Sequence, residues 1–284
     1  MTWTLSAFAD EAADSAADQI AALTRAKIDH VDLRSVDGIN IVELPVDHAK
    51  KVKQMLDDAG IKVGMYGSPI GKTDIADPID IELKRMDHLG KMREVFGATN
   101  VRAFSFYNKE GLPVGRWKEL SFDKLIKLRD RAGELGLVLY HENETEVYGD
   151  HPDQIVELAE LRSDHFKLIY DFANYQRTGV EPWANWERLK PMTDALHFKD
   201  QKENGDHVPI GQGDTKAKEI MADAVKVGWS GPCTLEPHLF MSDAVLSTNV
   251  HGRGDTSLQG KSREELFQIA AESARQLMAN AGAM

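Results

Sequence analysis

Four short apolar segments in the second half of the chain each carry a side chain that can bind a metal ion. The first segment ends at Glu142, the second ends at Asp171, the third contains His197 and the fourth ends at Glu236. This oxygen-rich donor set with one nitrogen suits Mn²⁺, and it could also hold Mg²⁺, Co²⁺ or Zn²⁺. One such carboxylate could be a helix cap or a surface charge. Four in register predict a shared metal site, because converging buried charges need compensation.

Eight β-prone runs alternate along the chain with segments of helical periodicity. The predicted strands cover residues 3–8, 29–33, 61–66, 100–106, 136–141, 167–171, 195–198 and 233–236. The predicted helices cover residues 13–27, 45–59, 78–96, 122–135, 152–161, 183–189, 215–227 and 263–281. Several helix ends carry signals: Gly60 and Gly97 are good C-caps, Ser121 is a candidate N-cap, and a capping box begins at Ser262.

This alternation predicts an α/β fold, a closed (β/α)8 TIM barrel that forms a single domain over residues 1–284. An open doubly wound sheet is the alternative, but it usually has about five or six strands and a glycine-rich loop after the first. Here residues 7–11, which follow the first predicted strand, contain no glycine. Reactive side chains of a barrel lie at the carboxyl ends of its strands, so Glu142, Asp171, His197 and Glu236 should meet at one mouth.

The composition is that of an ordinary globular protein, with 42% hydrophobic and 28% charged residues. The 34 basic and 46 acidic residues give a net charge of −12, which argues against nucleic acid as a partner and against DNA repair. Cys233 is the single cysteine, so no intrachain disulfide can form. There is no secretory signal and no apolar run of about 18 residues, so we expect a cytoplasmic protein outside the membrane.

The strand ends resemble the xylose isomerase-like superfamily, which includes sugar isomerases and epimerases, inosose-processing enzymes and endonuclease IV. The matching segments are SAFADE (6–11), SPIGK (68–72), HEN (141–143), DFAN (171–174), HFKD (197–200), HVPIGQGD (207–214) and GPCTLEP (231–237). The resemblance implies that Glu142, Asp171, His197 and Glu236 are the metal ligands. It also implies that the two glutamates are catalytic and move the proton. Ketose epimerases tend to have a substrate-binding histidine where this chain has Asn174, which can still bond a hydroxyl.

Other polar side chains near these strand ends are candidates for substrate binding. Lys199 and His238 each follow a candidate ligand by two residues, so period-two alternation turns them to the same side. Lys199 could hold a substrate oxygen or a phosphate, or it could pair with Asp200. His238 could contact the substrate or support a ligand. Arg102 and Arg34 point inward or outward depending on register; each could bind a polar substrate group, and a surface ion pair is the alternative for Arg34.

Two aromatic residues and two residues beside Glu142 complete the candidates. Tyr66 and Phe8 lie at strand ends and are predicted to line the substrate pocket, although most aromatics in a barrel pack the core. Asn143 is expected to fix a loop or a ligand by hydrogen bonding. His141 has the opposite strand parity to Glu142, so we expect it to face the helices as a core histidine.

Together these features predict a metal-dependent isomerase or epimerase that acts on a small sugar-like keto compound through an enediolate. Two alternatives stay open: a lyase of the inosose dehydratase type, and a non-catalytic sugar-binding barrel. Residues 241–260 form a long connection after the last strand, which we expect to cover the mouth or to contact a neighbouring subunit. His251 and Arg253 in this connection are further candidates for substrate contact, and a homo-oligomer is compatible with the sequence.

Overall fold

The predicted strands form a closed parallel barrel in the computed structural model, which describes residues 3–240 and 253–284. The barrel strands are β1 (Thr4–Ala7), β2 (His30–Leu33), β5 (Lys62–Ile70), β6 (Asn100–Ala103), β7 (Val138–Glu142), β8 (Phe166–Asp171), β9 (Ala195–Phe198) and β12 (Pro232–Leu235). Their order around the ring is β1-β12-β9-β8-β7-β6-β5-β2. Each predicted strand overlaps one of these strands, so the (β/α)8 fold is confirmed.

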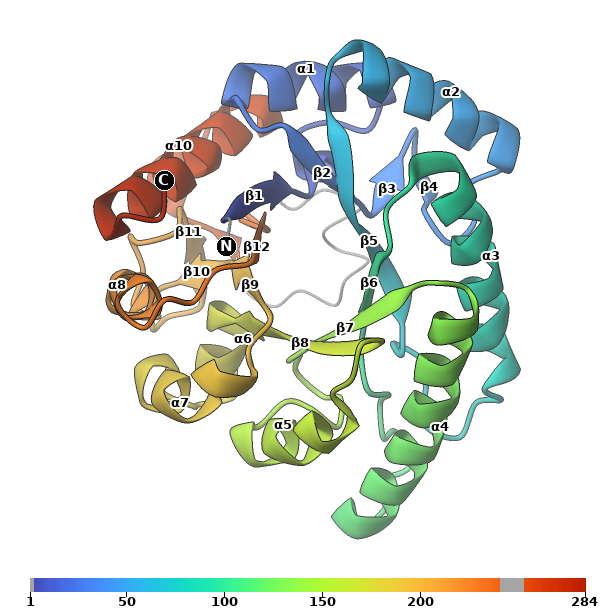
Figure 1. Ribbon diagram of the computed structural model, residues 1–284. Coiled ribbons are helices and arrows are strands. Elements are labelled where there is room, and N and C mark those ends of the chain that lie inside the picture. Colours follow the sequence, from blue (N-terminus) through green and yellow to red (C-terminus); the bar gives the residue numbers. More distant parts are fainter. Residues whose placement is uncertain (1–2, 241–252) are drawn as a thin grey trace.

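Helices surround this ring of strands (Figure 1). The α-helices are α1 (Ala16–Ala26), α2 (Val46–Asp58), α3 (Asp80–Phe96), α4 (Val114–Glu134), α5 (Pro152–Leu158), α6 (Phe172–Arg177), α7 (Pro182–Leu189), α8 (Ala217–Lys226) and α10 (Arg263–Ala281). The 3₁₀ turns are η1 (Ala9–Glu11), η2 (Ala159–Leu161), η3 (Lys190–Met192) and η4 (Thr256–Leu258). Apolar side chains such as Leu23, Leu89, Leu128 and Phe267 are buried where the helices cover the strands. This packed layer holds the strand ends in place.

Two helix starts show how local signals and tertiary contacts compete. The capping box of α10 is confirmed, because Ser262 accepts from the backbone N–H of Glu265 and the Glu265 carboxylate accepts from the Ser262 N–H. The prediction that Ser121 begins a helix is wrong, because α4 begins at Val114. Ser121 is buried within that helix, where its hydroxyl donates to the carbonyl oxygen of Ser105 at 3.1 Å. A contact across the fold therefore uses the hydroxyl that the sequence assigned to a cap.

Short elements that the sequence did not predict follow the carboxyl ends of several barrel strands. They are the hairpin of β3 (Ser35–Val36) and β4 (Ile39–Asn40), helix α6, and a sheet of β10 (Asp200–Gln201), β11 (Asp206–Val208) and β13 (Arg253–Gly254). Strand β13 belongs to the long connection predicted over residues 241–260, and Arg253 Nε lies 2.9 Å from Asp206 Oδ1. His251 lies outside the described residues. Among the described residues, no helix combines the length and the apolar character needed to cross a bilayer.

Candidate active site

Glu142, Asp171, His197 and Glu236 converge at the carboxyl end of the barrel. Glu142 and Asp171 are the last residues of β7 and β8, His197 lies in β9, and Glu236 directly follows β12. One possible ligand atom from each side chain lies within 4.8 Å of the others, and all four residues are buried. His197 Nδ1 is 3.0 Å from Glu142 Oε1 and 3.3 Å from Glu236 Oε2. The structure thus brings together the four residues predicted as ligands.

Lys199 and Arg102, two of the predicted substrate contacts, pair directly with this cluster. Lys199 Nζ lies 3.0 Å from Asp171 Oδ2 and 3.5 Å from Glu236 Oε2. Arg102 Nη1 lies 3.3 Å from both Glu142 Oε2 and Glu236 Oε1. Burial opposes ionisation of Glu236, but Lys199, His197 and Arg102 hold its pKa well below its ordinary value. Glu236 is therefore a carboxylate at neutral pH.

Arg34 connects the cluster to a second acidic pair that sequence reasoning did not select. Arg34 Nε and Nη2 lie 2.8 and 3.0 Å from the two carboxylate oxygens of Asp10, and Nη1 lies 3.2 Å from Glu236 Oε1. Glu11 accepts from the backbone N–H of His238 at 2.8 Å and lies 2.9 Å from its Nδ1. Arg34 is only 3% exposed, so its alternative as a surface ion pair is wrong. The one sequence signal for Asp10 and Glu11 is their position just after the first strand.

This ion-pair network carries more negative than positive charge. Its five carboxylates and three permanent cations are Asp10, Glu11, Glu142, Asp171, Glu236, Arg34, Arg102 and Lys199. With all five carboxylates ionised and His197 neutral, two negative charges remain, and a divalent cation would balance them. Burial raises the pKa of both Glu11 and Asp171 to about 7, and a bound cation would favour their ionised forms. Burial lowers the pKa of His197, but Glu142 and Glu236 raise it to about 9, so this site attracts positive charge. The donor set and the charge excess both fit an oxygen-preferring divalent ion.

Asn143 and Asn174 hold the loop after β7 against the end of β8. Asn143 Nδ2 donates to the carbonyl oxygen of Asp171 at 3.1 Å, and its Oδ1 accepts from the Asp171 N–H at 2.8 Å. Asn174, in the unpredicted helix α6, donates to the carbonyl oxygen of Asn143 at 2.8 Å and lies 3.5 Å from Glu142 Oε1. Asn143 thus has the loop-fixing contacts that the sequence indicates, and Asn174 lies beside a candidate ligand.

The two aromatic candidates lie in different layers. The Phe8 ring is edge-on to His197, with centroids 5.8 Å apart, and the guanidinium of Arg102 lies 4.8 Å from its centroid. Tyr66 is fully buried with its ring 6.4 Å from that of Phe96, the last residue of α3. The register of β5 thus turns Tyr66 outward between barrel and helices. The structure brings Phe8 to the cluster and does not bring Tyr66 there.

His141 faces away from the cluster, as its strand parity predicts. Its Nε2 lies 2.9 Å from Ser105 Oγ, and its ring stacks against Phe166 with centroids 6.3 Å apart. Burial lowers the pKa of His141 to about 4, so it is a neutral core residue at pH 7.

Comparisons with known proteins agree with this architecture. The sequence matches the xylose isomerase-like TIM barrel family over residues 10–245. The chain belongs to this family.

Several solved structures are similar to this xylose isomerase-like barrel. L-ribulose 3-epimerase shares 14% identity at a TM-score of 0.75, and the match covers 99% of this chain and 96% of that one. An IOLI protein with a zinc atom shares 15% identity at a TM-score of 0.74 over 100% of both chains. The probable 3-DHS dehydratase AsbF from Bacillus anthracis shares 12% identity at a TM-score of 0.70, over 97% and 99% of the two chains. No curated protein gave a significant match. At these identities the solved structures support the fold alone.

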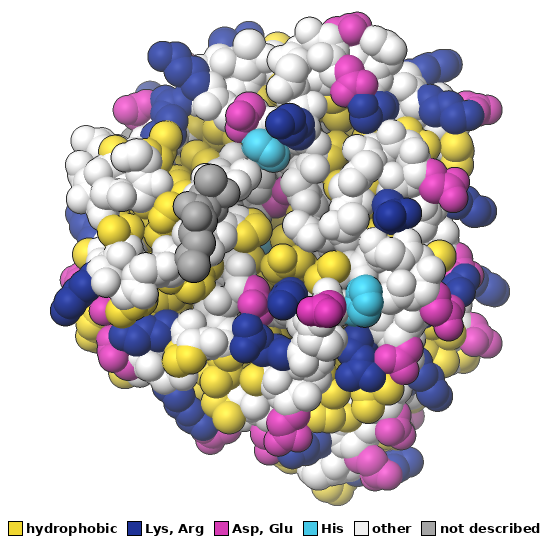
Figure 2. Space-filling view, viewed as in Figure 1, with side chains coloured by type: hydrophobic (Ala, Val, Ile, Leu, Met, Phe, Trp, Pro, Cys, Tyr) yellow, Lys and Arg dark blue, Asp and Glu magenta, His cyan; other side chains and the backbone are white. Residues whose placement is uncertain are grey.

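The surface of this xylose isomerase-like barrel mixes both signs of charge. On the face shown in Figure 2, Lys and Arg side chains alternate with Asp and Glu around the rim.

Proposed function

We propose that this chain is a divalent-metal-dependent isomerase or epimerase of a sugar or sugar-like keto compound. The observation that supports it best is the convergence of Glu142 and Glu236 on the same two partners, His197 and Arg102. The two glutamates come from β7 and from the end of β12, which lie three steps apart in the ring. Carboxylates that reach one substrate from two sides suit removal of a proton and its return to the opposite face.

Glu142, Asp171, His197 and Glu236 would hold the ion, with Mn²⁺ as the favoured metal and Mg²⁺, Co²⁺ or Zn²⁺ as alternatives. The zinc atom in the similar IOLI structure makes metal identity part of the test. When bound, the ion would polarise the substrate carbonyl and stabilise the negative charge that develops on its oxygen.

The protein side chains would perform the proton transfer and orient the substrate. One glutamate removes the proton from the carbon beside the carbonyl, and the other returns a proton. In an epimerase the proton returns to the opposite face of the same carbon, and in an isomerase it goes to the former carbonyl carbon. Arg102 lies between the two carboxylates and favours their ionised forms. Lys199, Asn174 and His238 are the groups that we propose hydrogen-bond to substrate hydroxyls. Burial of the cluster excludes bulk water and strengthens these interactions.

A dehydratase is the second candidate, because the fold is also that of a probable 3-DHS dehydratase. The same enediolate could expel a hydroxyl from the next carbon, as in a lyase of the inosose dehydratase type. A product lighter by one water identifies this reaction, whereas an isomerase or epimerase conserves the substrate mass. A purely sugar-binding barrel would convert no substrate at all.

The proposed partner is a small sugar-like molecule, and we propose that the protein binds neither nucleic acid nor a membrane. A cytoplasmic location and a homo-oligomer are parts of the same proposal. Cell fractionation and light scattering of the purified protein test them.

The decisive test combines metal analysis with isotope exchange. The protein is grown in metal-replete medium, its metal content is measured, and a panel of keto sugars and inososes is incubated in D₂O. We expect one divalent ion per chain, and solvent deuterium in the product at the carbon beside the carbonyl. Glu142→Gln and Glu236→Gln should each lower turnover at least about a hundredfold, whereas Glu119→Gln on an exposed helix face should not.

Because both glutamates are also candidate metal ligands, each variant is compared at equal metal loading. A metal-loaded Glu236→Gln protein with normal turnover and normal deuterium uptake would exclude the two-carboxylate mechanism. Wild-type protein that binds no divalent ion would contradict the metal site itself.

A further inference from the structure

Asp32 is a buried carboxylate that the proposed reaction does not use. It lies in β2 and is 2% exposed. Its Oδ2 accepts from Ser6 Oγ at 2.8 Å and from Thr234 Oγ1 at 2.7 Å, and both donors are uncharged. Its Oδ1 has no hydrogen-bond partner in the described part of the chain. A buried carboxylate with neutral donors and one unpaired oxygen is destabilising, so its presence here needs a physical reason.

The strand register places Asp32 near His197. Thr234 is the register partner of His197 on the neighbouring strand, and Ser6 is the register partner of Thr234. Side chains at paired positions of a parallel sheet face the same side, so Ser6 and Thr234 face the barrel interior, as His197 does. Both hydroxyls bind Asp32, so its carboxylate also lies inside the barrel.

The barrel interior around Asp32 also contains an apolar layer. Met65, the register partner of Asp32, packs there against Ile169 and Ala195. Ile169 and Ala195 each precede a proposed metal ligand by two residues in the same strand, so they face inward one step below the cluster. Asp32 therefore brings a carboxylate into the layer directly beneath the metal site.

A β-bulge with a glycine shapes the space around Asp32. The pairing of β2 with β5 changes register between Val31 and Asp32, and Gly64 is the extra residue between the paired positions. A Cβ at Gly64 would lie 2.8 Å from Asp32 Oδ1, so a larger residue would collide with the carboxylate. Bulges of this kind often direct a side chain beside an active site. The local backbone thus accommodates this carboxylate although its burial is unfavourable.

His197 carries a second buried atom without a partner. Its Nδ1 lies 3.0 Å from Glu142 Oε1 and 3.3 Å from Glu236 Oε2, so this nitrogen faces the metal site. Its Nε2 is buried and has no hydrogen-bond partner among the described residues. Burial raises the pKa of Asp32, while its two hydroxyl donors and the positive charge of protonated His197 lower it, so the two side chains interact through space. A metal-binding histidine usually donates its other N–H to a carboxylate, a carbonyl or a water.

We propose that Asp32 is a positioning residue for His197 and acts through one buried water, which accepts from Nε2–H and donates to Asp32 Oδ1. Buried waters of this kind bridge polar groups that have no direct partner. The bond keeps the proton on Nε2, leaves Nδ1 free to bind the ion and makes the imidazole a stronger ligand. Asp32 thus lowers stability and raises metal affinity. This inference rests on the proposed function, because it deepens the proposed metal site.

The first test measures metal affinity and stability in the same variant. Binding of Zn²⁺ and Mn²⁺ is measured by competition with a chelator, and Tm is measured in EDTA at pH 8. We expect Asp32→Asn to weaken metal binding about 10- to 100-fold and to raise Tm. If Asp32 only supported the fold, its loss would lower Tm, so the opposite signs of the two effects separate the two roles.

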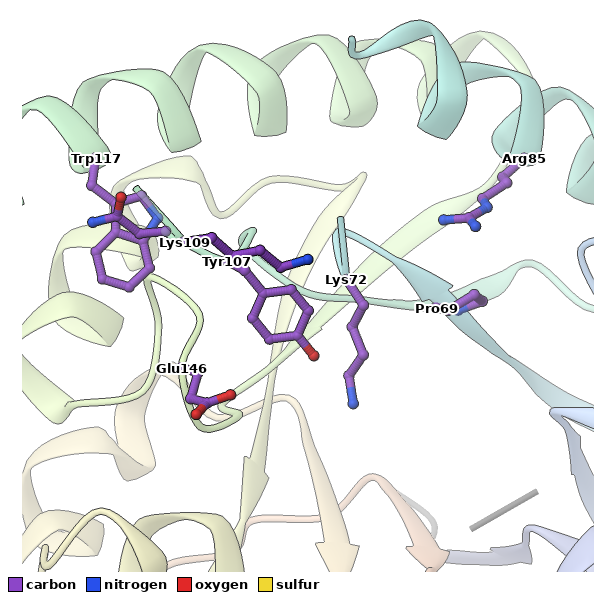
Figure 3. A pocket seen from close by; sticks show the side chains of 8 residues that line it. Pro69, Lys72, Arg85, Tyr107, Lys109, Trp117 and Glu146 are labelled. Carbon is purple, nitrogen blue, oxygen red and sulfur yellow. The ribbon is translucent and has the colours of Figure 1, made fainter. Parts of the chain in front are cut away.

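Glu82→Gln is the matched control, because Glu82 is also a fully buried carboxylate. Glu82 lies on α3, outside the barrel, and pairs with Arg85, which lines a cavity of about 700 Å³ between the loops that follow β5, β6 and β7 (Figure 3). Loss of this ion pair should lower Tm, whereas metal affinity should match that of wild type.

Nuclear magnetic resonance of the zinc-loaded protein separates positioning from simple loss of charge. With ¹⁵N-labelled histidine, the Nε2–H resonance of His197 is identified by its dependence on zinc. We expect Asp32→Asn to shift this resonance and to speed its exchange with solvent, because the hydrogen bond loses its charged acceptor. Glu82→Gln should leave the resonance unchanged.

Wild-type metal affinity in Asp32→Asn, or weakened binding with an unchanged Nε2–H resonance, overturns the inference and leaves the metal site intact. Wild-type protein that binds no divalent ion overturns both the inference and the metal site. Neither measurement depends on turnover, so weakened binding together with a shifted resonance supports the role of Asp32 even if the proposed reaction fails.

Discussion

Arg34 offers a direct test of the buried ion network, through Arg34→Met. The side chain is 3% exposed, bonds both oxygens of Asp10 at 2.8 and 3.0 Å, and lies 3.2 Å from Glu236. Removing one partner of a buried pair typically costs about 3–5 kcal/mol, because the remaining charge stays desolvated. At about 2–4 °C per kcal/mol for a large domain, Tm should fall by roughly 6–20 °C.

The assay is thermal unfolding followed by circular dichroism in EDTA, so that no bound ion compensates for the change. Arg188→Met is the matched control, because Arg188 and Asp153 form an ion pair with side chains 48% and 84% exposed. Such a pair contributes about 0.2–1 kcal/mol, so its loss should shift Tm by only a few degrees. The Asp10→Asn/Arg34→Met double variant should recover part of the loss, because it also removes the unpaired carboxylate. Equal shifts for Arg34→Met and Arg188→Met would refute the reasoning.

Three further predictions concern stability. Ser262→Ala removes the N-cap of α10 and should cost about 1 kcal/mol in urea unfolding; no change would mean that tertiary packing alone holds this helix start. Gly71→Ala should cost at least about 2 kcal/mol, since a Cβ there would lie 2.1 Å from the Phe104 carbonyl oxygen at φ +85°. Gly38→Ala is the control, because Gly38 has φ +74° and nothing within 4 Å of an added Cβ, so its cost in stability comes from backbone strain alone. Equal losses of stability in Gly71→Ala and Gly38→Ala would disprove the clash with Phe104. Burial raises the pKa of Asp32, so the ionised carboxylate destabilises the folded protein above that pKa. This destabilisation is lost as the pH falls through the pKa and the carboxylate is protonated. Asp32→Asn should therefore raise Tm at pH 8 and raise it less at pH 4.5; a pH-independent difference would contradict this assignment.

Local patterns determined the fold class and the central cluster. The alternation of strand and helix signals predicts eight βα units, and the parallel closed barrel has them at the predicted places. The position of Glu142, Asp171 and Glu236 at strand ends was sufficient to bring them together, because parallel strands in a barrel present their carboxyl ends to one mouth. The capping box at Ser262 was also predicted correctly from the sequence, since its donor and acceptor lie within one helical turn.

Tertiary structure decided which polar groups meet across the fold. Glu11 lies more than two hundred residues from His238, and no local pattern indicates that its carboxylate accepts from the His238 backbone. The sequence allowed Arg34 to lie in a surface ion pair, but the structure buries it between Asp10 and Glu236.

Register and long-range bonds decided the remaining cases. Tyr66 ends a predicted strand, yet the β5 register turns it toward α3, and Ser121 bonds to Ser105 instead of beginning a helix. A strand's periodicity indicates that alternate side chains face opposite sides, but only the neighbouring strands select which set faces inward. The residue types and strand ends of the site were therefore readable from the sequence, whereas burial, pairing and charge balance depended on contacts between distant segments.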